Sequence, residues 1–438
     1  MVLDNKQHIY VLGAGRGSRL GSFISKPLVK LDNDSCLLEI QIKHMFGNRP
    51  FSVITGYKED LYNSLDCHTI SNPDWELGII SSIKTALEDS RLKQYENIII
   101  IDGDLLLSKE AFDNLYQTKN SILLVDANNI ELISGLNNIF LSYEDNRLVY
   151  SSANTLAWGC AVNLEVDKLT CLLCKDESND LFISKLIGEK LEPVVEKQLY
   201  IEVDEPENLQ VLNQYIKDMS QDIADQFWVS RVSDYPSRLI QDARISKQRE
   251  ELEIKFIYNT INKYKINTDN VLDLGAGNGF STGVVKPTNR YDLVDLNNNY
   301  VQTLKELVKY EERYTVTCCN ILDYVIKHRY DLYFLLGVIQ YIIDDSNLES
   351  LFAKIAESMD DNSFLLLRNS SSLESDLLIN NYSEDLNSEY SAKYRTIKSI
   401  DTLLRKVNLK IIEWQFLLPK ELDSKYGTRQ VYFVITKC

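Results

Sequence analysis

Two glycine-rich loops, one near the start of each half of the chain, constrain the fold more than any other feature of the sequence. The first lies in HIYVLGAGRGSRLG at residues 8–21 and the second in NVLDLGAGNGF at residues 270–280. Each loop follows an apolar run typical of a β-strand and precedes a stretch with helical character. A glycine turn between a strand and a helix is typical of α/β proteins. The sequence therefore predicts that each half forms an α/β domain of its own.

The length of 438 residues supports this division, because a single hydrophobic core stops growing at about 250–300 residues. In the first half, strand-like runs alternate with helical or loop segments, which predicts a largely parallel sheet covered by helices. These runs lie at residues 51–55, 97–101, 122–125 and 199–203. We place the boundary near residue 224, which gives domains 1–224 and 225–438.

The second half repeats the alternation and adds a distinctive end. Its strand-like runs lie at residues 271–274, 291–295, 314–318, 331–336, 364–368, 410–415 and 431–436. The last two runs have no long helix between them, so they are predicted to form an antiparallel pair that closes the sheet. Residues 207–265 are typical of a polar amphipathic helix, interrupted at 233–237. We therefore expect an α/β fold of two Rossmann-like, three-layer domains.

Charge and composition restrict the partners. The formal net charge of −17 opposes binding to a polyanion, so nucleic acid is not an expected partner. The longest apolar run, at 332–343, is too short to span a bilayer, and no secretory leader is recognised. Eight cysteines without a framework spacing favour reduced thiols. We expect a cytoplasmic protein without membrane insertion, and its oligomeric state stays open.

The first loop combines glycines with cationic side chains. Gly13, Gly15 and Gly17 leave backbone N–H groups free to approach a phosphate chain. Ser18 stands where a dinucleotide loop has its third glycine, and no Gly-Lys-Ser/Thr follows. Arg19 and the Lys-Pro pair that begins at position 26 lie just beyond the loop. The spacing therefore fits neither a dinucleotide loop nor a P-loop, and the two cations strengthen the case for a phosphate ligand.

The stretch LGAGRGSRLGSFISKPLVKL resembles the signature of the nucleotidyltransferases that activate sugar phosphates and phospho-alcohols. The resemblance continues through VITGYKEDL, SNPDW, IIIIDGD and IEVDEPENL, and it is strongest to cytidylyltransferases that make CDP-alcohols. It implies a mixed, GT-A-like sheet and transfer of CMP from CTP to a phospho-alcohol or phosphonate, with Mg²⁺ bound and pyrophosphate released. The acceptor phosphate is already ionised, so positioning and charge neutralisation carry the catalysis.

The same resemblance gives the residues of the first site their roles. Arg19 would hold the β and γ phosphates, and Lys26 would neutralise the α-phosphoryl oxygens. Carboxylates at strand ends would bind Mg²⁺, namely Asp104 and Asp204, with Asp102 and Glu202 as weaker candidates. The nucleotide would lie against Leu12, Gly13, Ala14, Gly15, Gly17 and Ser18. The acceptor is expected near Tyr57, Lys58, Trp75 and Trp158.

The second loop carries an acid where a phosphate loop would not. Asp273 precedes Gly275 and Gly277 in an even G-x-G-x-G spacing, and the next strand ends in Asp295. A carboxylate before the first glycine suits the ammonium of a methionyl group and would repel a pyrophosphate. Asp295 suits the hydroxyl groups of a ribose. The pattern favours S-adenosylmethionine over a dinucleotide.

VLDLGAGNG resembles the first motif of class I methyltransferases, and the resemblance continues through DLVDLN, TCCNILDY, YDLYFLLGVIQYI and FLLLRNS. It implies a seven-stranded sheet and S-adenosylmethionine as the methyl donor. The residues that it places around this cofactor are Asp273, Gly275, Gly277, Asp295, Asn320, Ile321 and Leu336. The variable segment that follows offers candidates for contact with the methyl acceptor: Tyr382, Tyr390, Tyr394 and Arg395.

The leading hypothesis is a bifunctional enzyme that activates a phospho-alcohol or phosphonate and methylates a related headgroup. One alternative joins a sugar-1-phosphate nucleotidyltransferase to a sugar O-methyltransferase. Another has one half serving only as a ligand-binding or regulatory module. The sequence leaves open both acceptors, the order of the two reactions and the choice between N- and O-methylation.

Overall fold

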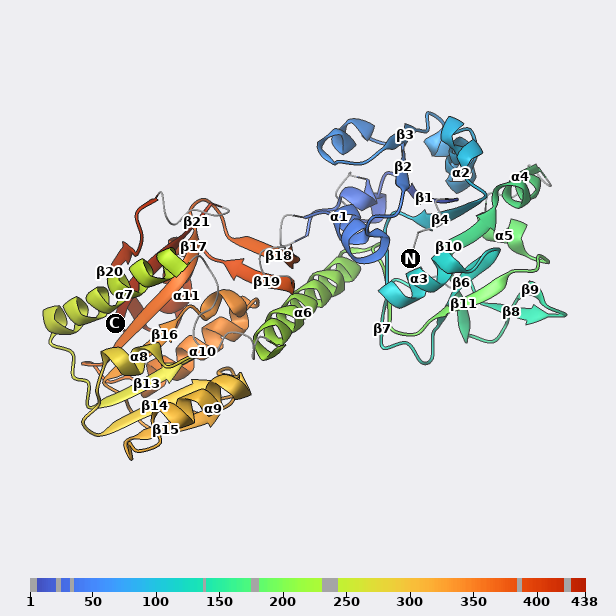
Figure 1. Ribbon diagram of the computed structural model, residues 1–438. Coiled ribbons are helices and arrows are strands. Elements are labelled where there is room, and N and C mark those ends of the chain that lie inside the picture. Colours follow the sequence, from blue (N-terminus) through green and yellow to red (C-terminus); the bar gives the residue numbers. More distant parts are fainter. Residues whose placement is uncertain are drawn as a thin grey trace. The chain divides into compact units, whose positions relative to one another are not determined.

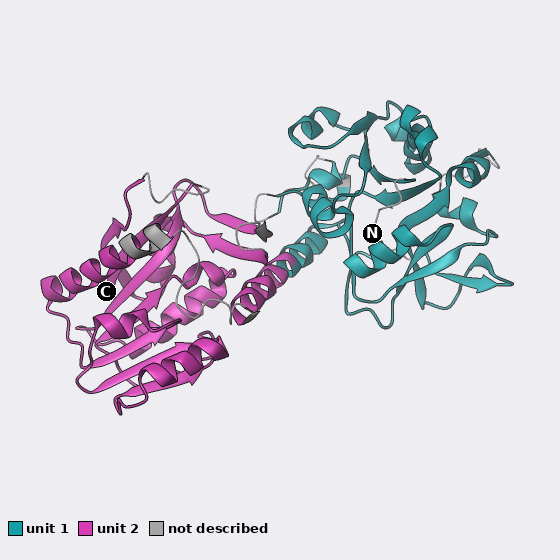
Figure 2. Cartoon of the chain, viewed as in Figure 1, with its two compact units in different colours: residues 1–215 teal, residues 216–438 magenta. Residues whose placement is uncertain are grey.

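The computed structural model describes residues 6–20, 25–31, 35–136, 139–174, 181–230, 243–383, 388–420 and 427–438. The chain divides into two compact units, residues 1–215 and 216–438 (Figure 2). The division falls within α6 (Pro206–Ser230). Each unit is built on its own seven-stranded sheet, so the expected α/β class is confirmed.

The main sheet of the first unit has the strand order β11-β6-β10-β4-β1-β2-β3 (Figure 1). β10 runs antiparallel to β4 and β6, and the remaining neighbours are parallel, so the sheet is mixed. Its interior strands are mostly apolar because both of their faces are buried. The strands are β1 (Gln7–Leu12), β2 (Phe51–Thr55), β3 (Thr69–Ser71), β4 (Asn97–Asp102), β6 (Ser121–Asp126), β10 (Leu156–Glu165) and β11 (Glu192–Glu196).

A smaller sheet in this unit changes one expectation. The predicted strand at 199–203 forms as β12 (Leu199–Glu202), but it pairs with β5 (Leu105–Leu107) and β7 (Leu132–Ser134), outside the main sheet. The antiparallel pairing with β5 brings the residues after β12 beside those after β4. The remaining elements are α1 (Leu37–Gln41), α2 (Ile79–Leu87), α3 (Lys109–Gln117), α4 (Val166–Cys174), α5 (Phe182–Leu186) and the hairpin of β8 (Leu141–Glu144) with β9 (Arg147–Tyr150).

The second unit has the sheet order β15-β14-β13-β16-β17-β21-β20. All neighbours are parallel except β21, which is antiparallel to β17 and β20, as expected for the closing pair. This is the seven-stranded arrangement that the sequence predicted. The strands are β13 (Asn270–Leu274), β14 (Arg290–Asp295), β15 (Tyr314–Cys318), β16 (Leu332–Leu336), β17 (Phe364–Ser372), β20 (Leu409–Phe416) and β21 (Thr428–Lys437).

Helices cover both faces of the second sheet, and each face has its own apolar core. The helices are α7 (Ala243–Tyr264), α8 (Phe280–Val284), α9 (Asn298–Leu307), α10 (Asp345–Ser358) and α11 (Ile397–Lys406). A hairpin that the sequence analysis missed, β18 (Leu377–Ser383) with β19 (Ser388–Tyr394), follows β17. Because β13, β14 and β16 are parallel neighbours, their carboxyl ends meet at one edge, which is where such sheets bind ligands.

No helix in the described part of the chain combines the length and the apolar character that crossing a membrane requires.

Candidate active sites

Hydrogen bonds fix the backbone of the glycine loop after β1 on its inner side, and its outer side is open. The Tyr62 hydroxyl donates to the Gly13 carbonyl at 3.1 Å, and the Ser25 hydroxyl donates to the same oxygen. A Cβ at Gly13 would lie 2.6 Å from the Tyr62 oxygen, so the fold itself requires glycine there. At Gly15, a Cβ would meet no described atom within 4 Å, and Gly17 has φ +62°. The loop therefore leaves its outer face to a ligand.

The predicted cations and carboxylates of the first unit come together beside this loop. The Lys26 ammonium forms ion pairs with Asp104 and Asp204, and the Arg19 guanidinium lies 2.8 Å from an Asp204 oxygen. Lys26 begins a short 3₁₀ helix, η2 (Lys26–Leu28). Gly103 lets the chain turn after β4, because a Cβ there would lie 2.8 Å from the Leu12 carbonyl oxygen. Four residues that are far apart in sequence thus share one charge cluster.

Glu202 completes a group of carboxylates that sequence analysis had ranked lower. The oxygens of Asp104, Glu202 and Asp204 all lie within 4.8 Å of one another. Burial raises the pKa of Glu202 to about 7, and the charges of Asp104 and Asp204 add to this. Three carboxylates around one point form an oxygen-rich set that a hard divalent cation such as Mg²⁺ prefers. The chain therefore has residues that fit the implied metal.

Asp102 ends β4 and is partly exposed, whereas Asp104 is buried. Asp102 forms a second close group with Cys160 and Glu202, whose ligand atoms also lie within 4.8 Å of one another. Burial, followed by repulsion from Asp104 and Glu202, raises the pKa of Asp102 well above its ordinary value. Its group holds a thiol in place of a third carboxylate, so it suits Mg²⁺ less well than the group of Asp104, Glu202 and Asp204. The sequence gave no indication of Cys160, which β10 brings here.

A cleft of about 260 Å³ opens over the glycine loop. One wall is formed by the loop, Lys26, Asp102 and Asp104, and the other by Trp75 and the start of α2. The Tyr57 ring lies 5.6 Å from Trp75, and the Arg16 and Lys58 cations lie 5.7 and 5.4 Å from the Tyr57 ring. Trp158 is buried in β10 and does not line the cleft, so that expected acceptor position is wrong. Of Ser18 only the backbone is described, at the start of η1 (Ser18–Leu20).

Three glycines of the second loop adopt left-handed backbone conformations. Gly275, Gly277 and Gly279 have φ of +83°, +53° and +81°, a region that other residues adopt only with strain. A Cβ at Gly275 would also clash with Val338, which follows β16. The Asp295 carboxylate accepts from the Gly277 N–H at 2.8 Å. The loop and the predicted ribose-binding acid are therefore in direct contact.

Other predicted cofactor residues gather at the same edge of the sheet. The Asn297 N–H also donates to Asp295 at 2.8 Å, and the Cys319 N–H donates to the Asp295 carbonyl at 3.0 Å. The next two residues are Asn320, whose side chain accepts from the Leu322 N–H at 3.0 Å, and the buried Ile321. Leu336 ends β16, the strand beside β13. The loops after β13, β14, β15 and β16 thus surround one position.

Asp273 differs from Asp295 in its surroundings. Its side chain is buried at the end of β13, and one carboxylate oxygen accepts from the Ser281 hydroxyl. The other oxygen has no hydrogen-bond partner among the described residues. Burial raises the pKa of Asp273 to about 7. Its contact with a methionyl ammonium stays a prediction.

Two arginines near this edge hold the backbone. Arg368 in β17 donates to Glu253 of α7 at 2.9 Å and lies 3.4 Å from the Leu336 carbonyl, a contact that sequence analysis missed. Arg395, expected to contact the methyl acceptor, is fully buried instead. Its guanidinium pairs with Asp345 and donates to the carbonyls of residues 339, 342 and 343. Arg395 therefore fixes the loop after β16 and is not available to a substrate.

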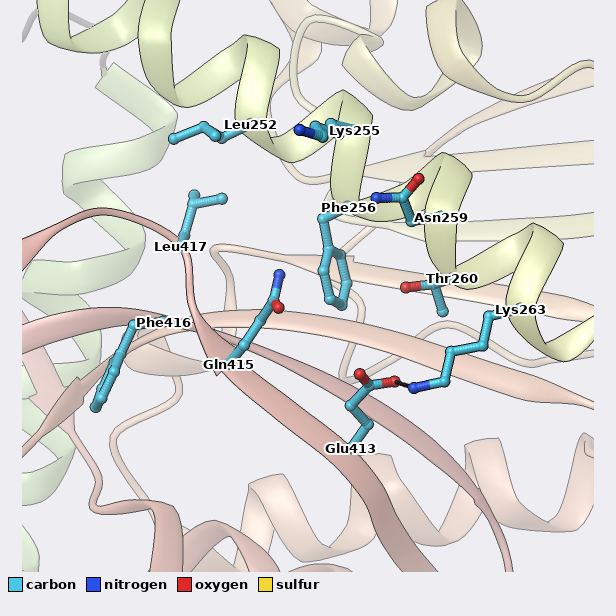
Figure 3. Close-up of a pocket in the computed structure, with 10 residues that line it drawn as sticks. All are labelled: Leu252, Lys255, Phe256, Asn259, Thr260, Lys263, Glu413, Gln415, Phe416 and Leu417. Atoms are coloured by element: carbon cyan, nitrogen blue, oxygen red, sulfur yellow. Dashed lines mark hydrogen bonds and ion pairs between the residues drawn. The ribbon is translucent and has the colours of Figure 1, made fainter.

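A separate cleft of about 430 Å³ lies between α7 and β20 (Figure 3). Its charged residues include Lys263 and Glu413, which pair at 2.9 Å across it. None of the predicted site residues lines this cleft. Its volume alone gives no reason to place chemistry there.

Comparisons with known proteins match the two halves separately. Residues 9–129 match the family model described as the MobA-like NTP transferase domain. A search of curated proteins gives no match. The C-terminal half is similar to solved methyltransferase structures.

Three of these structures illustrate the likeness. A SAM-dependent methyltransferase from Leishmania major is 14% identical, with 49% of this chain and 82% of that one covered and a TM-score of 0.39. One from Clostridium acetobutylicum is 15% identical, with 51% and 99% covered and a TM-score of 0.35. The 1,6-didemethyltoxoflavin-N1-methyltransferase of Burkholderia thailandensis, with 1,6-didemethyltoxoflavin and S-adenosylhomocysteine bound, is 16% identical, with 51% and 89% covered and a TM-score of 0.38.

Proposed function

We propose that the chain is a bifunctional enzyme: a magnesium-dependent cytidylyltransferase joined to an S-adenosylmethionine-dependent methyltransferase. The observation that carries the first activity is the meeting of Lys26 and Arg19 with Asp104 and Asp204 beside an open glycine loop. A cluster that holds both signs of charge can receive a triphosphate and a cation together. A purely structural ion pair would not need the uncovered glycines next to it.

In the first reaction, an acceptor phosphate or phosphonate oxygen attacks the α-phosphorus of CTP and pyrophosphate leaves. Arg19, whose side chain is 63% exposed, is free to turn toward the β and γ phosphates. Lys26 would neutralise the charge that develops on the α-phosphoryl oxygens in the transition state. Asp104, Asp204 and Glu202 would hold Mg²⁺, which neutralises phosphate charge when bound. No side chain needs to act as a base, because the nucleophile is already an anion.

In the second reaction, the loops after β13, β14, β15 and β16 would hold S-adenosylmethionine. Asp295, fixed by two backbone N–H groups, would accept from the ribose hydroxyls. Gly275 and Gly277 allow the close approach of the cofactor to the backbone. Methyl transfer from a sulfonium needs mainly alignment and exclusion of water. The product of the chain would then be a methylated headgroup carried on CDP.

Measuring pyrophosphate release tests the first activity. CTP, UTP, ATP and GTP are each paired with phosphocholine, phosphoethanolamine, 2-aminoethylphosphonate, glycerol phosphate and sugar 1-phosphates. We expect turnover with CTP and a phospho-alcohol or phosphonate. Turnover with sugar 1-phosphates alone would overturn the CDP-alcohol assignment. Calorimetry with S-adenosylmethionine tests the second activity, and a failure to bind would leave that half without a catalytic role.

A further inference from the structure

Five aromatic rings gather in the second unit, and we call Phe227, Trp228, Tyr341, Tyr390 and Tyr394 the aromatic cluster. The Trp228 ring lies edge-on to Tyr341 at 4.9 Å between centroids, and the Phe227 ring lies edge-on to Tyr390 at 5.3 Å. The hydroxyls of Tyr390 and Tyr394 are 2.7 Å apart. Of these rings only Phe227 is fully buried. The cluster therefore combines ring contacts with partly open ring surface.

Hydrogen bonds fix the aromatic cluster to the predicted cofactor edge at two points. The Asn297 side chain, next to the Asp295 loop, donates to the Trp228 carbonyl at 2.6 Å. The Gln340 side chain, adjacent to Tyr341 in sequence, donates to the Gly337 carbonyl at 3.1 Å. Gly337 directly follows Leu336, which is predicted to border the methyl donor. The cluster thus lies where a methyl acceptor would have to lie.

Gln340 also leaves an acceptor atom unused. The residue is 7% exposed, and its Oε1 atom has no hydrogen-bond partner in the described ranges. A buried amide oxygen without a partner costs free energy unless a ligand or water satisfies it. An N–H or O–H group of a substrate, placed next to Gly337, would satisfy it.

The charge beside the cluster is negative on the α6 side. The Gln221 amide nitrogen donates to the Asp225 carboxylate at 2.9 Å and to the Tyr341 carbonyl at 3.0 Å, so it bridges the two. Asp225 forms no ion pair with any residue that the structure describes. Burial raises the pKa of Asp225. The hydrogen bond from Gln221 lowers this pKa in part, and the charges of Asp222 and Asp323 raise it further.

The cations near the cluster already have carboxylates beside them. Arg368 pairs with Glu253 and interacts electrostatically with Tyr341. Arg249 interacts electrostatically with both Glu253 and Tyr341. On the β19 side, Lys393 pairs with Asp345, and the same carboxylate also pairs with the buried Arg395. Asp225 is therefore the carboxylate that Gln221 links to the cluster, and no described cation pairs with it.

We propose that the methyl acceptor is an amine, with its nitrogen against the aromatic cluster and Asp225 as the group that receives its proton. This inference rests on the proposed methyltransferase function. Asp225 takes a proton from the ammonium, and the nitrogen lone pair then forms the N–C bond as the C–S bond breaks. The sulfur keeps the electron pair and leaves as the neutral thioether of S-adenosylhomocysteine. The positive charge passes to nitrogen, where aromatic faces stabilise it.

Methyl transfer to matched acceptors tests this inference on the full chain. The amines are ethanolamine, phosphoethanolamine and 2-aminoethylphosphonate with their N-methyl forms, and the control is 2-hydroxyethyl phosphate. We expect N-methylated product, identified by mass, and none from the hydroxyl control. Tetramethylammonium should bind the S-adenosylhomocysteine complex, which calorimetry measures.

Variants of α6 separate a catalytic from a structural role. Asp225→Asn should lower kcat by about 10²–10⁴-fold, the usual range for a proton-transfer group, with S-adenosylmethionine affinity unchanged. Raising the pH should restore part of the rate, because more amine is then deprotonated without help. Glu207→Gln, exposed near the start of the same helix, is the control and should leave methyl transfer unchanged.

The outcomes separate this inference from the proposed function. If S-adenosylmethionine binds but the methyl group passes only to hydroxyl acceptors, the inference is wrong and the methyltransferase assignment stands. Failure of the complex to bind tetramethylammonium, or a kcat for Asp225→Asn that equals wild type at every pH, also overturns the inference. If S-adenosylmethionine itself does not bind, the proposed function fails and the inference falls with it.

Discussion

Replacing Lys26 with methionine tests the first site at the group on which its charge balance depends. Lys26 pairs with Asp104 and Asp204, and these three side chains are 21%, 8% and 14% exposed. Burial by itself would lower the pKa of Lys26, but the two carboxylates outweigh burial and raise it, so the lysine stays charged. Methionine keeps an unbranched side chain of similar reach and removes the charge.

Two losses of known size follow from this change. Removing one group that stabilises charge in a transition state lowers kcat by about 10²–10³-fold, which is about 2.7–4 kcal/mol. Losing one partner of a buried ion pair costs about 3–5 kcal/mol of folding free energy. We expect about 1–3 kcal/mol here, because Arg19 still lies 2.8 Å from Asp204.

A gain is expected alongside these losses. In the nucleotide-free protein the ammonium of Lys26 occupies the carboxylates that a metal would use. Its removal should therefore tighten binding of Mn²⁺, used as a paramagnetic substitute for Mg²⁺. Metal binding to the folded state should in turn recover part of the lost stability.

Three measurements on the full chain check this prediction. Pyrophosphate release gives kcat and KM, urea unfolding with and without Mn²⁺ gives stability, and electron paramagnetic resonance gives Mn²⁺ affinity. Lys93→Met, at an exposed position in η6 (Ser90–Gln94), is the matched control and should behave as wild type. A Lys26→Met variant with normal kcat/KM, or with Mn²⁺ affinity equal to wild type, would refute the reasoning.

Three further changes have defined outcomes. Asp295→Ala removes the acceptor fixed by two backbone N–H groups and should weaken S-adenosylmethionine binding by about 10–100-fold (about 1.4–2.8 kcal/mol) in calorimetry. An unchanged affinity would refute its ribose role, and pyrophosphate release should not change. Gly275→Ala should destabilise the fold by about 1–3 kcal/mol in urea, because φ there is +83°. Gly283→Ala, in open space at an ordinary φ, should cost nothing, and equal effects of the two would contradict the argument. Burial, with Arg91 adding to it, lowers the pKa of His8 to about 4 from 6.5. The folded state therefore favours neutral histidine, and up to about 3 kcal/mol of stability present above pH 6.5 should be lost as pH falls toward 4. His8→Asn should flatten this part of the pH–stability curve, and an unchanged slope would exclude His8 as its source.

The parts of the fold that sequence reasoning found are those set by local pattern. Apolar runs that end in a glycine turn, such as the one before Gly13 and the one before Gly275, carry their own evidence of strand and loop. Lys26, Asp104 and Asp204 were found because each lies in a motif whose residue types match phosphate or metal chemistry. The structure brings them together as such motifs imply.

The parts that were missed depend on pairing between distant segments. Glu202 was only a weaker candidate, because its place beside Asp104 depends on β12 leaving the main sheet to pair with β5, a choice that the residues of β12 do not reveal. β10 contains Gly159 and a break in register between Trp158 and Val162, so its apolar run does not resemble a regular strand. Arg368 meets Glu253 across 115 positions of sequence. Contacts of this kind are properties of the assembled sheet and have no local pattern.

The two glycine loops also show why a loop by itself does not select its ligand. In the first unit, Lys26 and Arg19 keep Asp204 paired with cations, so the cluster can exchange those cations for a metal and a triphosphate. In the second, burial raises the pKa of Asp273 to about 7 and also raises the pKa of Asp295, where two backbone N–H groups oppose the rise. Two acidic side chains beside a glycine loop suit a cationic sulfonium donor better than a phosphate chain. The neighbouring side chains, more than the glycines, therefore separate a phosphate site from a sulfonium site.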